Sequence, residues 1–468
     1  MRRLPAPPRA ALERFRLGET FGRAIVAASS TTLARNLRVA QTVVELQAKL
    51  PSLTTPARRA AAGEWLAERL EGLGATYIKV GQFIASRSDV YGDDFASAFV
   101  GMHDGVAAVR GEQARDLVSA AVDVSRFESI DYEAASAASI AQVHRGRLAD
   151  GRRVVIKVVR PGVRESVRAD MRFLEAIASA AVRVADAIDA SPGARAGARQ
   201  ALDTVRDLSG YLCEELDLRA EARNLERFGA IYPPEHAEVR VPRLVREACG
   251  PDAVVMEYVP SVSVRSLGRR RPPQAAAGHA RRIMLVFIRQ LLTSGIVHGD
   301  PHVGNMGVDY SGRLVMYDFG SVVRLDREEV CHVKDLIASL VIGDARRAVA
   351  VLRRMGADVL DEGALEAYVG DYREYMRTLD FRAMAASAAS RASAVAKQGA
   401  TAASAIPIVL PGRISRIVRS FALLEGVCKA IDPGFNYFDT IAEAATRLPL
   451  ETVFDADFVA YKLRHDIL

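Results

Sequence analysis

Two short motifs in the second half of the chain carry residues suited to one kind of chemistry. The first is His298-Gly-Asp-Pro-His-Val-Gly-Asn305, and the second, a short interval later, is Asp318-Phe-Gly320. Asp300 can accept a proton from a hydroxyl group. The oxygen atoms of Asn305 and Asp318 are hard ligands, which suit Mg²⁺ far better than zinc. The motifs therefore predict a site that combines a base with magnesium ligands.

The residues between these motifs predict that the two meet in space. Residues 306–309 and 314–317 flank a Tyr-Ser-Gly-Arg turn, a pattern typical of a β-hairpin that returns Asp318 to face Asn305. An Asp, an Asn five positions later and then Asp-Phe-Gly have the spacing of a kinase-like phosphotransferase, which uses ATP and Mg²⁺. Each tripeptide alone is more often an ordinary turn, so the prediction rests on their joint order and spacing.

A predicted β-hairpin and a third strand near the middle of the chain have the pattern of a nucleotide-binding lobe. The predicted strands are residues 130–132, 140–148 and 153–159, and the predicted loop is residues 133–139. Kinases have glycines in this loop, which give its N–H groups access to phosphates. Here the residues are Ser136, Ala137, Ala138 and Ser139. Lys157 alternates with Val and Ile, as a phosphate-pairing lysine would; alternatively, it is an edge-strand residue that blocks aggregation.

Two long helices are predicted next, and the second is rich in acidic residues. The predicted helices are residues 163–190 and 199–228. An active kinase pairs its strand lysine with a helix glutamate, and we predict Glu221 as the partner of Lys157. At about 100° per residue, Asp217 and Glu221 share one face of a continuous helix while Glu215 points away. Glu215 and Asp217 are then available to another neighbour, unless these acids simply form a solvated face.

The following segments fit the second lobe of a kinase. A strand at residues 253–258 predicts the hinge, where backbone groups of Glu257 and Val259 would contact adenine. A helix predicted at residues 280–294 is apolar nearly all round and therefore buried. After Gly320 a new helix begins almost at once, which leaves no room for the activation segment that docks peptide substrates.

An earlier helix, predicted at residues 77–85, holds a second cluster of polar residues. Lys79 and Gln82 flank Gly81 in Lys-Val-Gly-Gln. Glycine inside a helix costs about 1 kcal/mol relative to alanine, so Gly81 indicates close approach of another backbone or of a ligand. The alternative is a helix with one surface lysine and a packing glycine.

The distribution of charged residues along the chain indicates which kinds of partner the protein could bind. The chain has 468 residues, 50% hydrophobic and 26% charged, with a formal net charge of +6, so two or three domains with a substantial core are expected. Arginines crowd the N-terminal segment, with few acids to offset them: Arg2, Arg3, Arg9, Arg14, Arg16, Arg23, Arg35, Arg38, Arg58 and Arg59. Such a segment is most often a solvated face, and peripheral contact with an anionic membrane is the alternative. No nucleic-acid partner is expected.

Targeting and redox signals are sparse. The apolar run at residues 24–28 leads directly into Ser and Thr, so a secretory signal is not predicted, whereas an organelle transit peptide is left open. No apolar run reaches the roughly 18 residues that span a bilayer. The cysteines are scattered without a Cys-x-x-Cys pair: Cys213, Cys249, Cys331 and Cys428. We expect a reducing compartment and a cytoplasmic protein, or one peripheral on the cytoplasmic membrane face.

Taken in order, these segments resemble the UbiB-type (AarF-like) atypical kinase family. The resemblance extends from about residue 70 to residue 436 and rests on Lys79-Val-Gly-Gln82, Ser136-Ala-Ala-Ser-Ile-Ala-Gln-Val-His144, Val155-Ile-Lys157, Glu215-Leu-Asp217, Glu221-Ala-Arg-Asn224, His298 to Asn305 and Asp318-Phe-Gly320. It implies an α+β, two-lobe, atypical protein-kinase-like fold with an added helical N-terminal extension. The expected parts are a basic, partly helical segment at 1–58, a helical extension at 59–115, an N-lobe with extra helices at 116–260 and a helical C-lobe at 261–468.

The resemblance also implies roles for the residues. Lys79 and Gln82 would meet Glu215 and Asp217, so that the extension covers the place where a protein substrate would bind. Family members are associated with ATP binding, lipid-stimulated ATPase activity and support of ubiquinone or related prenyl-lipid metabolism. The implied partners are ATP, a lipid or prenyl-quinone-related molecule, and a homodimer or biosynthetic complex.

This sequence departs from the family pattern in several places. Ser136 replaces the first alanine of the Ala-rich loop, Val303 replaces the usual proline, and Met102 begins a segment that differs from the family's Leu-Gln-Asp. The membrane-spanning helices with which many members end are not found. Three functions follow as hypotheses: an ATPase or small-molecule or lipid kinase, a nucleotide-sensing pseudokinase scaffold, and, disfavoured by the short activation segment, a protein Ser/Thr kinase.

Overall fold

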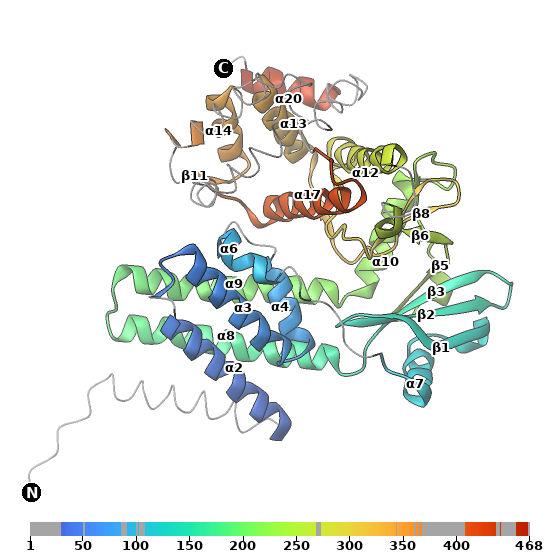
Figure 1. Cartoon of the computed structure of the whole chain (residues 1–468), viewed down its shortest axis with the longest axis horizontal. Helices are drawn as coiled ribbons and strands as arrows, with labels where there is room; N and C mark the ends of the chain where they lie inside the picture. The colour runs from blue at the N-terminus through green and yellow to red at the C-terminus, as the bar shows by residue number, and fades with distance from the viewer. Residues whose placement is uncertain are drawn as a thin grey trace, which may run out of the picture. The chain divides into compact units, whose positions relative to one another are not determined.

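The protein forms two compact units in a computed structural model (Figure 1). The structure describes residues 30–49, 52–85, 91–99, 102, 108–267, 273–342, 344–359, 362–363, 365–366, 408–436, 440 and 455–466. Unit 1 contains the described residues up to Ala85, together with Asp94–Ala220 and Val245–Val255; unit 2 contains the rest. Much of the basic N-terminal segment and the Ala/Ser-rich stretch at 385–405 lie outside the described residues.

Unit 1 combines helices with one antiparallel sheet. Its helices are α2 (Ser30–Lys49), α3 (Pro56–Glu71), α4 (Ala75–Ala85), α6 (Asp93–Ala96, whose first residue belongs to unit 2), η2 (Ser97–Phe99), α7 (Gly111–Ala121), η3 (Val124–Arg126), α8 (Val163–Ala187) and α9 (Pro192–Glu215). Its strands are β1 (Phe127–Ala137), β2 (Ala141–Leu148), β3 (Arg153–Val159) and most of β5 (Ala253–Glu257), in the order β1-β2-β3-β5. Helices α8 and α9 lie side by side as a long hairpin, and α4 packs on both (Figure 1).

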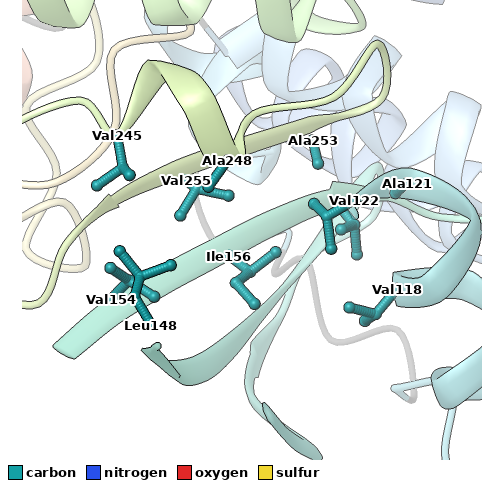
Figure 2. Close-up of a cluster of buried hydrophobic side chains, with 11 residues drawn as sticks. Val118, Ala121, Val122, Leu148, Val154, Ile156, Val245, Ala248, Ala253 and Val255 are labelled. Atoms are coloured by element: carbon teal, nitrogen blue, oxygen red, sulfur yellow. The ribbon is translucent and has the colours of Figure 1, made fainter. Parts of the chain in front are cut away.

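The core of the sheet lies between β3, β5 and helix α7. Val154, Ile156 and Val158 alternate on β3 and belong to one buried cluster with Val118 of α7 and Val255 of β5. Figure 2 shows this cluster. This period of two is what a strand requires for one buried face. Lys157 therefore leaves the strand from the opposite face, which is not part of this core.

Two predictions about local structure in this region are wrong. The predicted loop at 133–139 is mostly strand, because β1 continues to Ala137 and the hairpin turns tightly, with the Ala138 N–H bonded to the Ala141 carbonyl at 2.8 Å. The predicted helix at 199–228 is two helices, α9 and α10 (Leu218–Ile231), which are separated at Leu216 and Asp217. The Asp217 carboxylate accepts hydrogen bonds from the N–H groups of Arg219 and Ala220, as a helix N-cap does.

Unit 2 is mainly helical and contains two small sheets near the motifs. Its helices are α10, η5 (Val264–Ser266), α12 (Pro273–Thr293), α13 (Arg327–Ile342), α14 (Ala345–Arg354), α17 (Gly412–Ile431) and α20 (Ala456–Asp466). Its strands are β4 (Val239–Arg240), β6 (Ser261–Ser263), β7 (Ile296–His298), β8 (Met306–Asp309), β9 (Leu314–Met316), β10 (Val322–Arg324), β11 (Asp358–Val359) and β12 (Ile408–Val409). One sheet has the order β4-β9-β8-β6, and β7 pairs with β10. None of the described helices is both long enough and apolar enough to cross a bilayer.

A buried carboxylate joins three helices of unit 2. Asp335 of α13 is fully buried and pairs with Arg347 Nε of α14 at 2.9 Å. Arg354 Nη2 approaches the same carboxylate at 3.4 Å, and Lys462 Nζ of α20 approaches it at 3.3 Å. The Tyr461 hydroxyl donates to it as well. One negative charge thus holds cations from two other helices in place.

We predict that Asp335→Asn lowers the free energy of unfolding by about 3 kcal/mol, because it leaves these cations without their buried counter-charge. Urea unfolding of the full chain measures the effect. The matched control is Asp457→Asn, whose ion pair with Arg327 is exposed, so that variant should unfold almost as the wild type does. Equal unfolding curves for the two variants would show that Asp335 is not the anchor of α20.

Candidate active site

Backbone pairing ties together the two motifs that were predicted to meet. On one side, β7 pairs antiparallel with β10, so that His298 lies opposite Val322. The Gly299 N–H donates to the Ser321 carbonyl at 2.8 Å. The start of the first motif is therefore fixed beside the end of the second.

The other side is closed by the predicted hairpin, which is confirmed. Strands β8 and β9 pair antiparallel, with Met306 opposite Met316. Next to this pair, the N–H of Tyr317, which follows β9, donates to the carbonyl of Asn305, which precedes β8, at 3.0 Å. Asn305 and Asp318 therefore lie on neighbouring backbone segments. The segment that carries Asp300 is held at both ends by backbone hydrogen bonds.

Hydrogen bonds within the motifs orient the side chains of the expected metal ligands. The Asn305 amide nitrogen donates to the Asp300 carbonyl at 3.2 Å, which leaves the amide oxygen for a ligand. Asp318 accepts the Gly320 N–H through Oδ1 at 2.8 Å. Among the described residues there is no cluster of three or more His, Cys, Asp or Glu residues that would hold a metal on protein ligands alone. One carboxylate with one amide fits Mg²⁺, which usually keeps waters and substrate phosphates as its other ligands.

His298 is buried in an aromatic surrounding just before the candidate base. The ring centroids of Phe228, Phe287 and Phe319 lie between 6.0 and 6.5 Å from that of His298. Burial lowers the pKa of His298, and the nearby Asp318 and Asp300 charges oppose that effect only in part. The neutral ring accepts the Asp300 N–H at Nδ1, at 3.1 Å. His298 therefore orients the backbone at Asp300 and does not add charge to the site.

One face of α10 holds the Asp-Phe-Gly turn. The Phe319 N–H donates to Glu221 at 3.4 Å, and Asn224 donates to the Phe319 carbonyl at 3.0 Å. Phe228 packs its ring 5.0 Å from that of Phe319. These three α10 residues lie about one turn apart, so they share a helix face. Sequence analysis gave no role to Asn224 or to this contact of Glu221. Glu221 is in unit 2 and Lys157 is in unit 1, and their pairing stays a prediction.

Helix α17 adds two contacts to the catalytic segment that sequence analysis missed. The buried Ser420 hydroxyl donates to the His298 carbonyl at 2.7 Å. Arg419 Nη2 lies 3.8 Å from Asp300 Oδ1. On the opposite carboxylate oxygen, His302 Nε2 lies 3.9 Å away. No local pattern could have found Arg419, because it is one of many arginines and lies far along the chain from Asp300.

The predicted phosphate-contacting residues of unit 1 lie on one hairpin and the adjoining strand. Lys157 of β3 is opposite Val143 of β2, and Ser136 of β1 pairs with the same residue from the other side. Ala137 ends β1, and Ala138 begins the turn. Ser139 is fully buried, and its hydroxyl has no hydrogen-bond partner within the part of the chain that the structure describes. A buried hydroxyl without a partner is costly, which is consistent with a site for a polar ligand.

The Lys79 cluster is also found in unit 1. Lys79 Nζ pairs with Glu215 at 3.2 Å, and both side chains are largely buried. Tyr211 donates a short hydrogen bond to the same carboxylate. Gln82 donates to the Met102 carbonyl at 3.3 Å. The contact between Lys79 and Glu215 is therefore present, whereas the regulatory role of Lys79, Gly81, Gln82, Glu215 and Asp217 stays a prediction.

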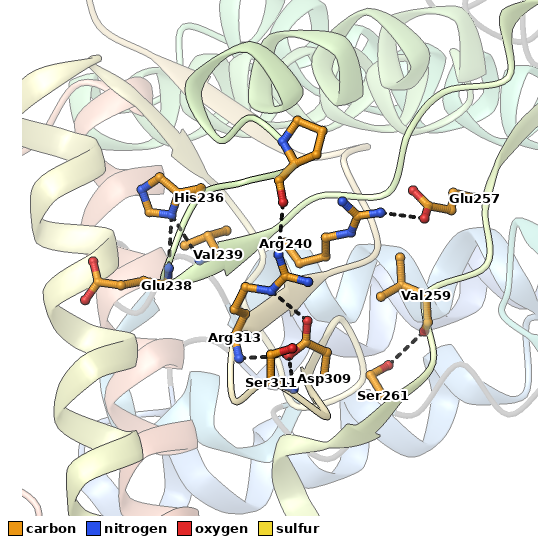
Figure 3. A network of polar contacts seen from close by, with 11 residues as sticks. His236, Glu238, Val239, Arg240, Glu257, Val259, Ser261, Asp309, Ser311 and Arg313 are labelled. Atoms are coloured by element: carbon orange, nitrogen blue, oxygen red, sulfur yellow. Dashed lines mark hydrogen bonds and ion pairs between the residues drawn. The ribbon is translucent and has the colours of Figure 1, made fainter.

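The side chain of the predicted hinge glutamate is engaged elsewhere. Glu257 forms an ion pair with Arg240 of β4 at 2.5 Å (Figure 3). It also accepts the Arg243 N–H. Together with Val259 and the β8–β9 turn, it lines a cavity of about 330 Å³ in unit 2. Asp309 and Arg313 pair with each other across that turn (Figure 3). These side chains pair with one another, the Glu257 N–H donates to the Arg243 carbonyl at 2.8 Å, and the Val259 carbonyl accepts the Ser261 hydroxyl at 3.1 Å. The adenine contacts of Glu257 and Val259 stay a prediction.

Comparison with known proteins decides the family. Residues 101–352, just over half of the chain, match the ABC1 atypical kinase-like domain. The chain belongs to this family. Its fold is therefore an atypical kinase-like α+β fold, here with helices α2 to α4 ahead of the kinase-like domain, and the predicted fold class is confirmed.

Relatives of this ABC1 chain occur in plants and bacteria. It is 26% identical over 404 residues to the chloroplastic protein "ACTIVITY OF BC1 COMPLEX KINASE 7" of Arabidopsis thaliana, covering 84% of this chain and 55% of that protein. It is 30% identical over 324 residues to "Probable protein kinase UbiB" of Pseudomonas putida, covering 66% of this chain and 56% of that protein. This chain thus spans about half the length of each.

A solved structure supports the fold alone. A Mycobacterium tuberculosis protein, crystallised with erythromycin, superposes with a TM-score of 0.53 at 18% identity. The match covers 86% of this chain and 95% of that chain. At this identity the similarity carries no inference about the ligand of the present protein.

Gly81 provides a test of the packing of the Lys79 cluster. A Cβ atom on Gly81 would overlap the Met102 sulfur and lie 3.2 Å from Phe99 Cδ1. We predict that Gly81→Ala lowers the free energy of unfolding by about 1–3 kcal/mol, the usual cost of overpacking. Thermal unfolding of the full chain measures it.

The matched control for this prediction is Gly72→Ala. Gly72 has ordinary right-handed helical φ and ψ, and a Cβ there would meet nothing closer than 3.6 Å. That variant should be as stable as the wild type or slightly more stable. If Gly81→Ala also left the unfolding temperature unchanged, α4 would not pack tightly on Met102.

Proposed function

We propose that this ABC1-family protein is a Mg²⁺-dependent ATPase, or a kinase for a small molecule or lipid. The observation that carries the proposal is the arrangement of Asp300, Asn305 and Asp318, which two strand pairings hold on adjacent backbones. A proton acceptor and two hard oxygen ligands in this arrangement are what phosphoryl transfer requires. Membership of a kinase-like family supports the use of ATP.

Each residue has a proposed task. Asn305 and Asp318 would hold Mg²⁺, which neutralises charge on the nucleotide phosphates when bound. Asp300 accepts the proton of the attacking hydroxyl or water. Lys157, supported by Glu221, would pair with phosphate oxygens, and the Ser136 to Ser139 segment would cover them with N–H and hydroxyl donors. Backbone groups of Glu257 and Val259 are proposed to contact adenine.

The acceptor is proposed to be a small molecule or lipid and not a protein. Only residues 321–326 separate the Asp-Phe-Gly turn from α13, and three of them form β10, which is paired with β7. This segment is too short to provide a docking platform for a peptide. The resemblance to UbiB-type proteins favours a prenyl-quinone-related lipid, and peripheral contact of the basic N-terminal segment with a membrane belongs to the same proposal. The domain boundaries near residues 59, 116 and 261 and an association into homodimers or biosynthetic complexes are proposed on the same basis.

We predict that Asp318→Asn lowers the rate of Mg²⁺-dependent ATP hydrolysis at least about 100-fold, because replacing the carboxylate by a neutral amide removes several kcal/mol of charge stabilisation from the metal. The assay uses pure protein with and without anionic liposomes. Asp326→Asn is the matched control, because Asp326 caps α13 and asparagine caps helices equally well. Unchanged hydrolysis by Asp318→Asn would remove the basis for the site assignment.

The main alternative is a nucleotide-sensing scaffold that binds ATP with little turnover. The two proposals are distinguished by single-turnover measurements with enzyme in excess over ATP. A transferase or ATPase converts bound ATP within the assay, and Asp300→Asn slows that conversion. A scaffold binds ATP with Asp318-dependent affinity but releases it unchanged. Efficient Asp300-dependent phosphorylation of added proteins would instead favour a protein Ser/Thr kinase.

A further inference from the structure

Two consecutive residues of α17 contact the catalytic segment at two different points. Ser420 is fully buried and donates its hydroxyl to the His298 carbonyl at 2.7 Å. Arg419, its neighbour, brings Nη2 to 3.8 Å from Asp300 Oδ1. The helix itself is fixed, because Ile417, Phe421 and Leu424 are buried beside these residues. Arg419 is thus placed by a packed helix and not by a mobile loop.

The separation between Arg419 and Asp300 is that of an ion pair without a direct hydrogen bond. Both side chains keep contact with solvent, with 16% of Arg419 and 26% of Asp300 exposed. A second cation near Asp300 is His302, which carries charge only when protonated. An arginine is charged at every pH that proteins tolerate. Arg419 is therefore a permanent positive charge beside the candidate base.

The chemistry of phosphoryl transfer places the reacting phosphorus within reach of such a cation. The acceptor oxygen must lie within about 3 Å of the base that takes its proton. The same oxygen lies in line with the phosphoryl group, whose three other oxygens carry the negative charge of the transition state. A guanidinium about 4 Å from the base is then close to those oxygens, and its planar set of N–H donors matches them.

We propose that Arg419 binds the γ-phosphoryl group while it is transferred, so that α17 supplies the transition-state cation of this site. The inference rests on the proposed function. In the step, the acceptor O–H gives its proton to Asp300 and its oxygen forms a bond to the γ-phosphorus. The bond from that phosphorus to the β–γ bridging oxygen breaks, and ADP leaves with the electron pair. Arg419 donates N–H groups to the non-bridging oxygens and stays charged throughout.

The test compares two substitutions of Arg419 with a control on the same helix. The variants are Arg419→Gln, which removes the charge, and Arg419→Lys, which keeps it but loses the planar fork. The control is Arg413→Gln, because Arg413 is more than half exposed and pairs with Glu329, away from Asp300. For each protein, kcat for ATP hydrolysis is measured, together with Kd for Mg·ADP and for Mg·ADP with aluminium fluoride, which mimics the phosphoryl group in transfer.

We expect Arg419→Gln to lower kcat at least about 100-fold, a bound set below the roughly 1,000-fold minimum that such arginines contribute. Its affinity for Mg·ADP with aluminium fluoride should fall by a similar factor, while its Kd for Mg·ADP stays within about threefold, since binding energy specific to the transition state is lost. For Arg419→Lys, kcat and the affinity for the aluminium fluoride complex should lie between the values for Arg419→Gln and those for the wild type. Arg413→Gln should match wild type in all three quantities.

The outcomes separate this inference from the proposed function. If wild type hydrolyses ATP and Asp318→Asn does not, but Arg419→Gln keeps full kcat and full affinity for the aluminium fluoride complex, the role of Arg419 is refuted and the function stands. An equal loss of affinity for both ADP complexes in Arg419→Gln and Arg419→Lys would mean that the arginine only maintains structure, which also overturns the inference. If wild type neither binds nor hydrolyses ATP, the proposed function fails and the inference fails with it.

Discussion

The placement of the candidate base depends on how the backbone of His298 is held. Its strand pairs with β10, its carbonyl accepts the Ser420 hydroxyl, and its ring is enclosed by three phenylalanines. The candidate base, Asp300, lies two residues later, so its backbone has little freedom to move. This arrangement agrees with a general property of active sites, in which reacting groups are positioned by rigid elements before the substrate arrives. The buried, neutral imidazole contributes to this order by accepting the Asp300 N–H.

The Asp-Phe-Gly turn is fixed in a different way, by side chains of one helix. Glu221 and Asn224 satisfy the two polar groups of the Phe319 backbone, while Phe228 fills the space beside its ring. Helix α10, which carries these three residues, begins at Leu218. Asp217 makes that beginning possible by capping α10. The acidic cluster of the sequence is therefore divided between neighbours: Glu215 meets Lys79, Asp217 caps a helix and Glu221 holds the turn.

The ion pairs of this protein differ in how they affect stability and the packing of the helices. Lys79 and Glu215 are both largely buried, and such a pair gains little net stability because its desolvation opposes its attraction. Its main effect is to specify how α4 meets α9, since either charge alone would be costly in that place. Asp335 has the same role among α13, α14 and α20, where one carboxylate meets more than one cation. The exposed ion pairs on the surface contribute little to the free energy of unfolding.

The sequence by itself determined the kinase-like class, the β8–β9 hairpin, strands β2, β3 and β5, and the order of the candidate catalytic residues. These features are local, because strand period, turn chemistry and motif spacing depend on residues close together in the chain. Tertiary structure alone decided how far β1 runs and that Arg419 and Ser420 reach the segment that carries Asp300. The break between α9 and α10 coincides with the local Asp217 cap, which helix periodicity does not register. Packing places α17 beside His298, and no pattern within either segment encodes that contact. The pairing of Lys157 with Glu221 stays a prediction.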